Sequence, residues 1–130
     1  MVYFESPQAK VTLNEEIKAV VMELKGFVQG EQYRTPLEKV LELLEQKKYN
    51  KILFDNINSS AIPPVDQNWV SQDWFPRAIQ NGLKYSASVT PEKPVAKSNM
   101  NRILSNMDIH PTIKQFNSFE EAMEWLSEVK

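Results

Sequence analysis

The sequence predicts one α/β domain, leaning toward α+β, in which helices pack on a mixed sheet. Two patterns predict this class. The first quarter of the chain holds three short strand-like segments with close turns, which is typical of an antiparallel meander. After it, helical and strand-like segments alternate as βα repeats, which favours parallel strands joined by right-handed crossovers. The length of 130 residues suits a single domain, residues 1–130, and a hydrophobic content of 42% is enough for a core.

The meander is expected from three segments that are aromatic, alternating or β-branched: residues 2–5, a segment around Val11 and Leu13, and residues 17–25. Gly26 ends the third strand. The first helix then begins with Thr35 as its N-cap and Pro36 at its first position, because Pro is tolerated there. Its apolar stripe is Leu37, Val40, Leu41 and Leu44, and Tyr33 joins that face if the helix starts earlier.

The second half continues the alternation. Residues 51–55 form an apolar run that fits a buried central strand, and residues 56–64 read as a polar loop. Asp66 is expected to cap a helix that Pro76 kinks or restarts and that Gly82 ends. The remaining elements are expected at residues 83–89 (strand), 95–107 (helix), 112–116 (strand) and, after a capping box of Ser118 with Glu121, a closing helix.

The sequence lacks the residues that several kinds of catalytic and metal-binding site require. There is no Cys and one His, His110, so thiol chemistry and sites that need two imidazoles are excluded. The three glycines are scattered and form no phosphate-binding loop. A net charge of −2 argues against nucleic-acid binding. We therefore expect no metal and no cofactor, and we do not expect an enzyme.

The N-terminus has neither the basic region nor the apolar region of a signal peptide. The longest apolar stretches are about five residues, far short of the roughly 20 that span a bilayer. A cytoplasmic protein without a membrane span is expected.

A family resemblance rests on three features: the strand from Ile52 to Asp55, the polar loop after it, and the ending FNSFEEAMEWL from Phe116 to Leu126. They resemble the SpoIIAA-like group of STAS domains, relatives of bacterial anti-sigma-factor antagonists. The resemblance implies a bacterial, non-enzymatic regulatory module that binds a protein partner. It also implies a phosphoacceptor Ser in an Asp-Ser-Ser-Gly type segment that opens a helix after the central strand.

This chain departs from that segment. Ser59 and Ser60 are the candidate phosphoacceptors, but no Asp-Ser-Ser-Gly is present, and Pro63-Pro64 moves the next helix start downstream. The group is also related in fold to lipid-binding SEC14 domains, which adds a lipid or small apolar ligand to the alternatives.

The loop that follows the central strand carries the candidate ligand site: Asp55, Asn56 and Asn58. Ligands of open α/β sheets bind beyond the carboxyl ends of strands, where a carboxylate can bind a cation or act as a base. The simpler interpretation, which we favour, is that Asp55 accepts backbone N–H groups of its own loop.

Three aromatic residues within seven positions, Trp69, Trp74 and Phe75, lie beside Arg77. On an α-helix Trp69 and Phe75 are about 120° apart, so one buried face does not accommodate all three. At least one is expected at the surface, as an anchor for a partner or for a homodimer, because Trp, Tyr and Arg dominate interface hot spots. The alternative is that the preceding loop covers them.

Two surface features receive simpler interpretations. Lys84, Lys93, Lys97 and Arg102 outnumber Glu92 between residues 84 and 102, which we interpret as a solvated face rather than a site for an anion. His110 is interpreted as an ordinary turn residue.

Three hypotheses for function follow. The first is a regulatory module that presents residues 56–65 and 69–77 to an unknown protein partner or a second copy. The second is a SEC14-like carrier of an apolar ligand, which needs a cavity of a few hundred Å³ lined by residues such as Phe54, Trp69 and Met100. The third, ranked lowest, is an enzyme in which Asp55, Asp66 or Asp73 converges with Arg77.

Overall fold

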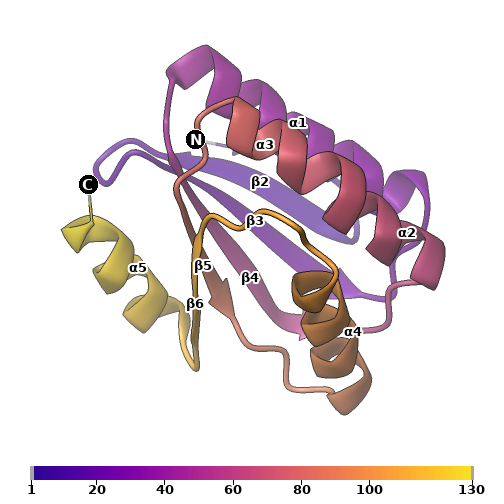
Figure 1. The fold of residues 1–130 in the computed structure, drawn as a ribbon. Helices are drawn as coiled ribbons and strands as arrows, with labels where there is room; N and C mark the ends of the chain where they lie inside the picture. Colours follow the sequence, from indigo (N-terminus) through magenta and orange to yellow (C-terminus); the bar gives the residue numbers. More distant parts are fainter. Residues whose placement is uncertain (1, 130) are drawn as a thin grey trace.

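The computed structural model describes residues 2–129 and shows a six-stranded sheet with helices on both faces (Figure 1). The strands are β1 (Val2–Glu5), β2 (Ala9–Asn14), β3 (Ala19–Gly26), β4 (Lys51–Ser59), β5 (Tyr85–Val89) and β6 (Thr112–Phe116). The helices are α1 (Glu31–Lys47), α2 (Pro64–Trp69), the π-helix η1 (Val70–Trp74), α3 (Phe75–Gln80), α4 (Pro94–Ser105) and α5 (Phe119–Glu128). The strands lie in the order of the sequence. β1 to β3 are antiparallel and β3 to β6 are parallel, so the predicted mixed sheet with an N-terminal meander is confirmed.

The strand order decides where the helices lie. Each crossover from β3 onward moves to the next strand in the same direction, so right-handed connections place α1, the segment α2–η1–α3, and α4 on one face. Their apolar residues form the larger core, with Leu37, Trp74 and Ile103 against Met22 and Ile52. α5 follows the last strand and covers the other face, where Ala122 and Leu126 pack on strands β3 to β5.

The first helix starts one turn earlier than expected. It begins at Glu31 with Gly30 as its N-cap, so the predicted cap at Thr35 is wrong and Pro36 lies inside the helix. Two long-range effects favour the extra turn. Tyr33 is buried in the core, and the carboxylate of Asp66 accepts the N–H of Gly30 at 2.9 Å. Gly30 has φ of +55°, a conformation in which Gly is the least strained residue.

Two further expectations at the centre of the chain are corrected. β4 continues to Ser59, four residues past the predicted end of the strand, so the polar loop is shorter than expected. Asp66 does not cap the helix that it belongs to, because α2 begins at Pro64 with Pro63 as its N-cap. At the C-terminus the capping prediction is confirmed: the Ser118 hydroxyl accepts the N–H of Glu121 at 3.2 Å.

No helix within residues 2–129 is long and apolar enough to cross a membrane.

Candidate functional site

The parallel strands β3, β4 and β5 end at one edge of the sheet, which we call the carboxyl edge. β4 carries most of the predicted site residues to it. Two residues of β4, Asn56 and Ile57, oppose one residue of β3 between the pairs Glu23–Asp55 and Lys25–Asn58. This bulge shifts the alternation of side chains along the strand. As a result Asn56 and Ser59 line the same cavity although they are three positions apart.

The predicted ligand site of Asp55, Asn56 and Asn58 does not assemble. Asp55 is nearly buried, and its carboxylate accepts the N–H of Ile57 at 3.4 Å, as the simpler interpretation expected. Asn56 faces the cavity on the other side of the sheet, and Asn58 is exposed. Burial raises the pKa of Asp55, with smaller contributions from the negative charges of Glu23 and Glu120, while the Ile57 N–H opposes the rise. Within residues 2–129 no cluster of His, Asp or Glu is suited to a metal ion.

The cavity lies between the sheet and helices α1 and α4. Its volume is about 60 Å³, and its wall combines apolar groups with hydroxyl and amide groups. Residues from eight strands and helices line it, among them Tyr33, Phe54, Asn56, Ser88 and Met100. An apolar cavity of about 150 Å³ holds one benzene molecule, so this one has room for a few water molecules and not for a lipid. Phe54 and Met100 line it as the carrier hypothesis expected, whereas Trp69 does not.

The two candidate phosphoacceptors differ in access. Ser59 is 5% exposed, and its hydroxyl donates to the carbonyl oxygen of Asn56 at 2.7 Å. Ser60 is half-buried, and its N–H donates to the carbonyl oxygen of Gly26 at 3.0 Å. Neither residue opens a helix, because α2 begins at Pro64. The hydroxyl group of Ser60 is therefore more accessible to a protein kinase than that of Ser59.

Two of the three aromatic candidates for an interface, Trp74 and Phe75, are not at the surface. Both are buried, and each packs edge-to-face on Phe54, with ring centroids 6.0 Å and 6.1 Å away. An α-helix cannot bury three side chains at these angles if only one of its faces is covered. In the structure the segment α2–η1–α3 contacts the sheet, α1 and α4, so its buried surface is wider than one stripe. η1 also has a wider turn, in which the N–H of Phe75 donates to the carbonyl oxygen of Val70, five residues back.

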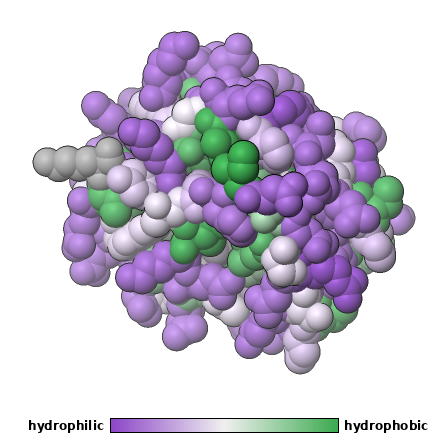
Figure 2. All heavy atoms as spheres, viewed as in Figure 1, coloured by the Kyte–Doolittle hydropathy of each residue, from purple (hydrophilic) through white to green (hydrophobic). Residues whose placement is uncertain are grey.

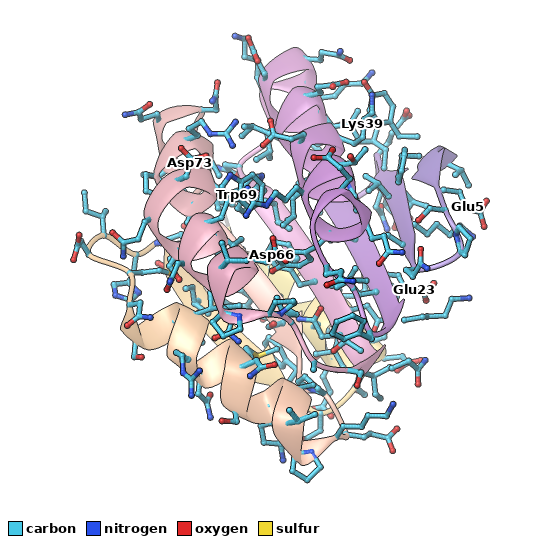
Figure 3. The ribbon with its side chains drawn as sticks, turned by 90° about the vertical axis from the view of Figure 1, so that its right-hand side faces the viewer. Glu5, Glu23, Lys39, Asp66, Trp69 and Asp73 are labelled. Carbon is cyan, nitrogen blue, oxygen red and sulfur yellow. The ribbon has the colours of Figure 1, made fainter. Side chains whose placement is uncertain are left out.

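Trp69 is the aromatic residue that reaches the surface. It lies between α1 and the segment α2–η1–α3 (Figure 3), with the guanidinium groups of Arg34 and Arg77 at 4.9 Å and 5.9 Å from its ring centroid. Both cations are paired within the chain. Arg34 bonds Asp66 at 2.9 Å, and Arg77 bonds Glu38 at 2.6 Å and Asp73 at 2.8 Å.

These contacts make the Trp69 side chain part of the packing between the helices. The carboxylates of Glu38 and Asp73 raise the pKa of Arg77, so its charge is fixed. The aspartates of the enzyme hypothesis do not converge on Arg77 as a group. Asp73 pairs with it on the exposed side of the helix, Asp66 pairs with Arg34, and Asp55 lies on the opposite face of the sheet.

Three exposed apolar side chains at the carboxyl edge were not predicted from the sequence as candidate site residues. Phe27 in the β3–α1 connection is 49% exposed, Val65 in the first turn of α2 is 66% exposed, and Val95 in the first turn of α4 is 47% exposed. Each follows the end of a parallel strand, after Gly26, Pro64 and Pro94 respectively. An apolar residue directly after such a breaker was the available signal. We call these three side chains the apolar trio.

The face of the molecule that Figure 2 draws is largely hydrophilic. Figure 2 shows one face of the molecule, on which hydrophobic residues form small areas between hydrophilic ones. The basic residues Lys84, Lys93, Lys97 and Arg102 are exposed and form no ion pair within residues 2–129, and His110 is exposed.

No protein-family model matches the sequence, and no curated protein is detectably similar to it. Solved structures are similar to it in fold. The anti-sigma factor antagonist SpoIIAA in its unphosphorylated form aligns with a TM-score of 0.67 at 12% identity, over 93% of this chain and 99% of that one.

Two further structures agree. An uncharacterised protein of the DUF3478 family from Shewanella loihica, with a SpoIIAA-like fold, has a TM-score of 0.62 at 13% identity and covers 95% of this chain and 98% of its own. A putative anti-sigma factor antagonist from Thermotoga maritima has a TM-score of 0.61 at 19% identity and covers 89% and 92%. The chain therefore has a SpoIIAA-like fold, which confirms the predicted resemblance at the level of structure.

Proposed function

We propose that this chain is a non-enzymatic regulatory module that binds a protein partner through the apolar trio at its carboxyl edge. The observation that carries the proposal is the exposure of Phe27, Val65 and Val95, one on each of three successive connections. Exposed apolar side chains that gather at one edge of a sheet are typical of a contact surface. Structures of the same fold are described as anti-sigma factor antagonists, which supports a protein partner.

The three connections are held together by hydrogen bonds between them. The N–H of Ser60 bonds the Gly26 carbonyl oxygen at 3.0 Å, and the N–H of Gly30 bonds Asp66 at 2.9 Å. The N–H of Ile62 bonds the side chain of Asn99 in α4, also at 2.9 Å. A surface that is already ordered loses little conformational entropy on binding. The apolar trio is thus presented on a rigid frame, as partner recognition requires.

The test compares two variants of the full chain. One replaces the apolar trio (Phe27→Ser, Val65→Thr, Val95→Thr). The matched control replaces Val2 and Ile109, which are 50% and 66% exposed away from the carboxyl edge (Val2→Thr, Ile109→Ser). Tagged proteins capture partners from a lysate of the source organism, and the affinity of the purified complex is then measured.

We expect a partner that the unchanged chain and the control retain, and that the trio variant binds at least tenfold more weakly. If the partner binds all three proteins with equal affinity, the proposal is wrong. Because the changed residues are exposed, the trio variant is expected to stay folded, which circular dichroism checks.

Phosphorylation of Ser60 is a second candidate function at the same edge. Its position one residue from the pairing of Gly26 with Ser59, and its partial exposure, favour it over Ser59. A phosphate there adds charge of about −1.5 to −2 next to an apolar surface and would weaken an apolar contact. Incubation with lysate and ATP should add about 80 Da to the chain and to Ser59→Ala, but not to Ser60→Ala. Absence of the added mass from the unchanged chain would end this candidate.

A further inference from the structure

A second surface lies at β6, which ends the sheet on the side opposite β1 (Figure 1). Within residues 2–129 β6 pairs only with β5, so the backbone groups on its outer side have no strand partner. Its side chains are exposed or half-buried on both faces. An edge of this kind is a template for an added strand.

A groove runs beside this edge, between β6 and α5. It is open, with a volume of about 280 Å³, and six residues line it: Lys114, Phe116, Glu121, Glu124, Trp125 and Glu128. Its wall is aromatic, since the rings of Phe116 and Trp125 lie 5.7 Å apart. The ammonium group of Lys114 lies 5.6 Å from the Phe116 ring centroid, so the groove already holds one cation against this wall.

The rim of the groove is acidic. Glu121, Glu124 and Glu128 are exposed, and within residues 2–129 none of them forms an ion pair. From residue 112 to residue 130 the sequence has four Glu and two Lys. Aromatic rings flanked by unpaired carboxylates complement the side chains of Arg and Lys, which stack on rings and pair with carboxylates.

We propose that β6 and the acidic groove of α5 bind an extended basic segment of a protein partner, which adds to the sheet as a further strand. Hydrogen bonds to the backbone of β6 would hold the segment. Because side chains alternate between the two faces of a strand, every second residue of the segment would point toward the groove. Arg or Lys at those positions would lie over Phe116 and Trp125 and beside Glu124 and Glu128.

Charge argues for such a partner and against a second copy of this chain. Two copies paired antiparallel through β6 would be related by a two-fold axis perpendicular to the sheet. Both α5 helices would then lie on the same face, and carboxylates would meet carboxylates. Like charges opposed in this way are a common device against pairing at sheet edges. This surface is separate from the apolar trio, whose residues lie in the segments that follow β3, β4 and β5.

The probe is a fluorescent peptide of alternating Arg and Val, eight residues long by design. A second peptide has the same composition in two blocks, so that it keeps the charge and loses the alternation. The full chain is compared with Glu124→Gln/Glu128→Gln. The matched control is Glu15→Gln/Glu16→Gln, which removes the same charge from the exposed turn between β2 and β3.

We expect the alternating peptide to bind the unchanged chain and the Glu15/Glu16 control equally, and the Glu124/Glu128 variant at least tenfold more weakly. The block peptide should bind weakly to all three. Amide hydrogen exchange should slow in residues 112–116 when the alternating peptide is bound. Equal binding of both peptides, equal loss in both variants, or protection elsewhere would overturn the proposal. So would a dimer of the unchanged chain whose exchange is slowed at β6.

Discussion

The indole N–H of Trp74 donates a 2.8 Å hydrogen bond to the backbone carbonyl oxygen of Leu37. The two residues are 37 positions apart, and both side chains are buried. The bond joins η1 to α1 at the centre of the larger core. It therefore links the two helical segments whose first turns contribute to the carboxyl edge.

Replacement of Trp74 is expected to lower the free energy of unfolding strongly. Trp74→Ala removes a large buried side chain and should lower the free energy of unfolding by about 3–5 kcal/mol. Trp74→Phe keeps most of the apolar contact but loses the bond to Leu37, so a smaller loss of about 1–3 kcal/mol is expected. Chemical denaturation measures both values. Trp69→Ala, in the same segment but partly exposed, serves as the control, and a loss as large as that of Trp74→Ala would contradict this account.

Trp74 also shows what the sequence could and could not predict. Strand and helix types followed from periodicity, because most elements bury one face and their apolar residues repeat accordingly. The segment from Pro64 to Gln80 is buried by the sheet, α1 and α4, so its pattern has no single stripe. The sequence of one segment does not show which other elements will pack against it. It therefore predicted that at least one of the three aromatic residues lies at the surface, but not that Trp69 is the one.

The start of α1 was missed for a related reason. Thr35-Pro36 is a strong local signal, but Tyr33 gains burial and Gly30 gains the carboxylate of Asp66 when the helix is one turn longer. These partners lie far away in the sequence. By contrast Ser118 and Glu121, whose interaction is local, were predicted correctly. The exposure of Phe27, Val65 and Val95 also depends on distant elements, because it requires that no other helix or strand packs over these side chains.

Asp66 is expected to stabilise the carboxyl edge. Its side chain is 2% exposed and accepts both the Gly30 N–H and the Arg34 side chain. Asp66→Ala leaves the Gly30 N–H without its acceptor and should lower the free energy of unfolding by about 1–3 kcal/mol. Asp66→Asn, which keeps an acceptor, should lower it less.

The control for Asp66 is Asp73→Ala. Asp73 also pairs with an arginine, but at the surface, where such pairs contribute about 0–1 kcal/mol. Chemical denaturation of the three variants ranks them, and we expect Asp66→Ala to lose the most. If Asp73→Ala were the least stable of the three, the link between Asp66 and Gly30 would not be the stabilising contact.

Lys51 is expected to hold the end of α5 on the sheet. Its ammonium group donates to the carbonyl oxygen of Leu126 at 2.6 Å and to that of Ile17 at 3.3 Å. The last carbonyl groups of a helix lack partners within the helix, so Lys51 satisfies one of them. Burial lowers the pKa of Lys51, with a smaller effect of the neighbouring charge of Lys18.

Lys51→Met keeps the aliphatic part of the side chain and removes both hydrogen bonds. Amide hydrogen exchange should become faster in residues 119–128, with a loss of about 1–2 kcal/mol in the free energy of unfolding. Lys18→Met changes an exposed neighbour and should leave this exchange as it is. Unchanged exchange in both variants would show that α5 does not depend on Lys51.

Asp55 is expected to make the stability depend on pH in a direction opposite to that of a salt-bridged carboxylate. Its pKa in the folded chain is raised above the usual 3.8, first by burial and then by Glu23 and Glu120. Just above the usual pKa the folded chain therefore binds more protons than the unfolded chain. The stability that protonated Asp55 contributes is present at low pH and is lost as the pH rises through the raised pKa.

At about pH 7 the buried ionised carboxylate thus lowers stability, and Asp55→Asn should be more stable than the unchanged chain, because Asn still accepts the Ile57 N–H. The difference should shrink as the pH falls through the raised pKa of Asp55, where the carboxylate becomes protonated. Urea denaturation across this range measures the difference at each pH. Asp108→Asn, at an exposed position, controls for the loss of one negative charge. A difference between Asp55→Asn and the unchanged chain that stays constant with pH would show that this carboxylate does not titrate under the influence of burial.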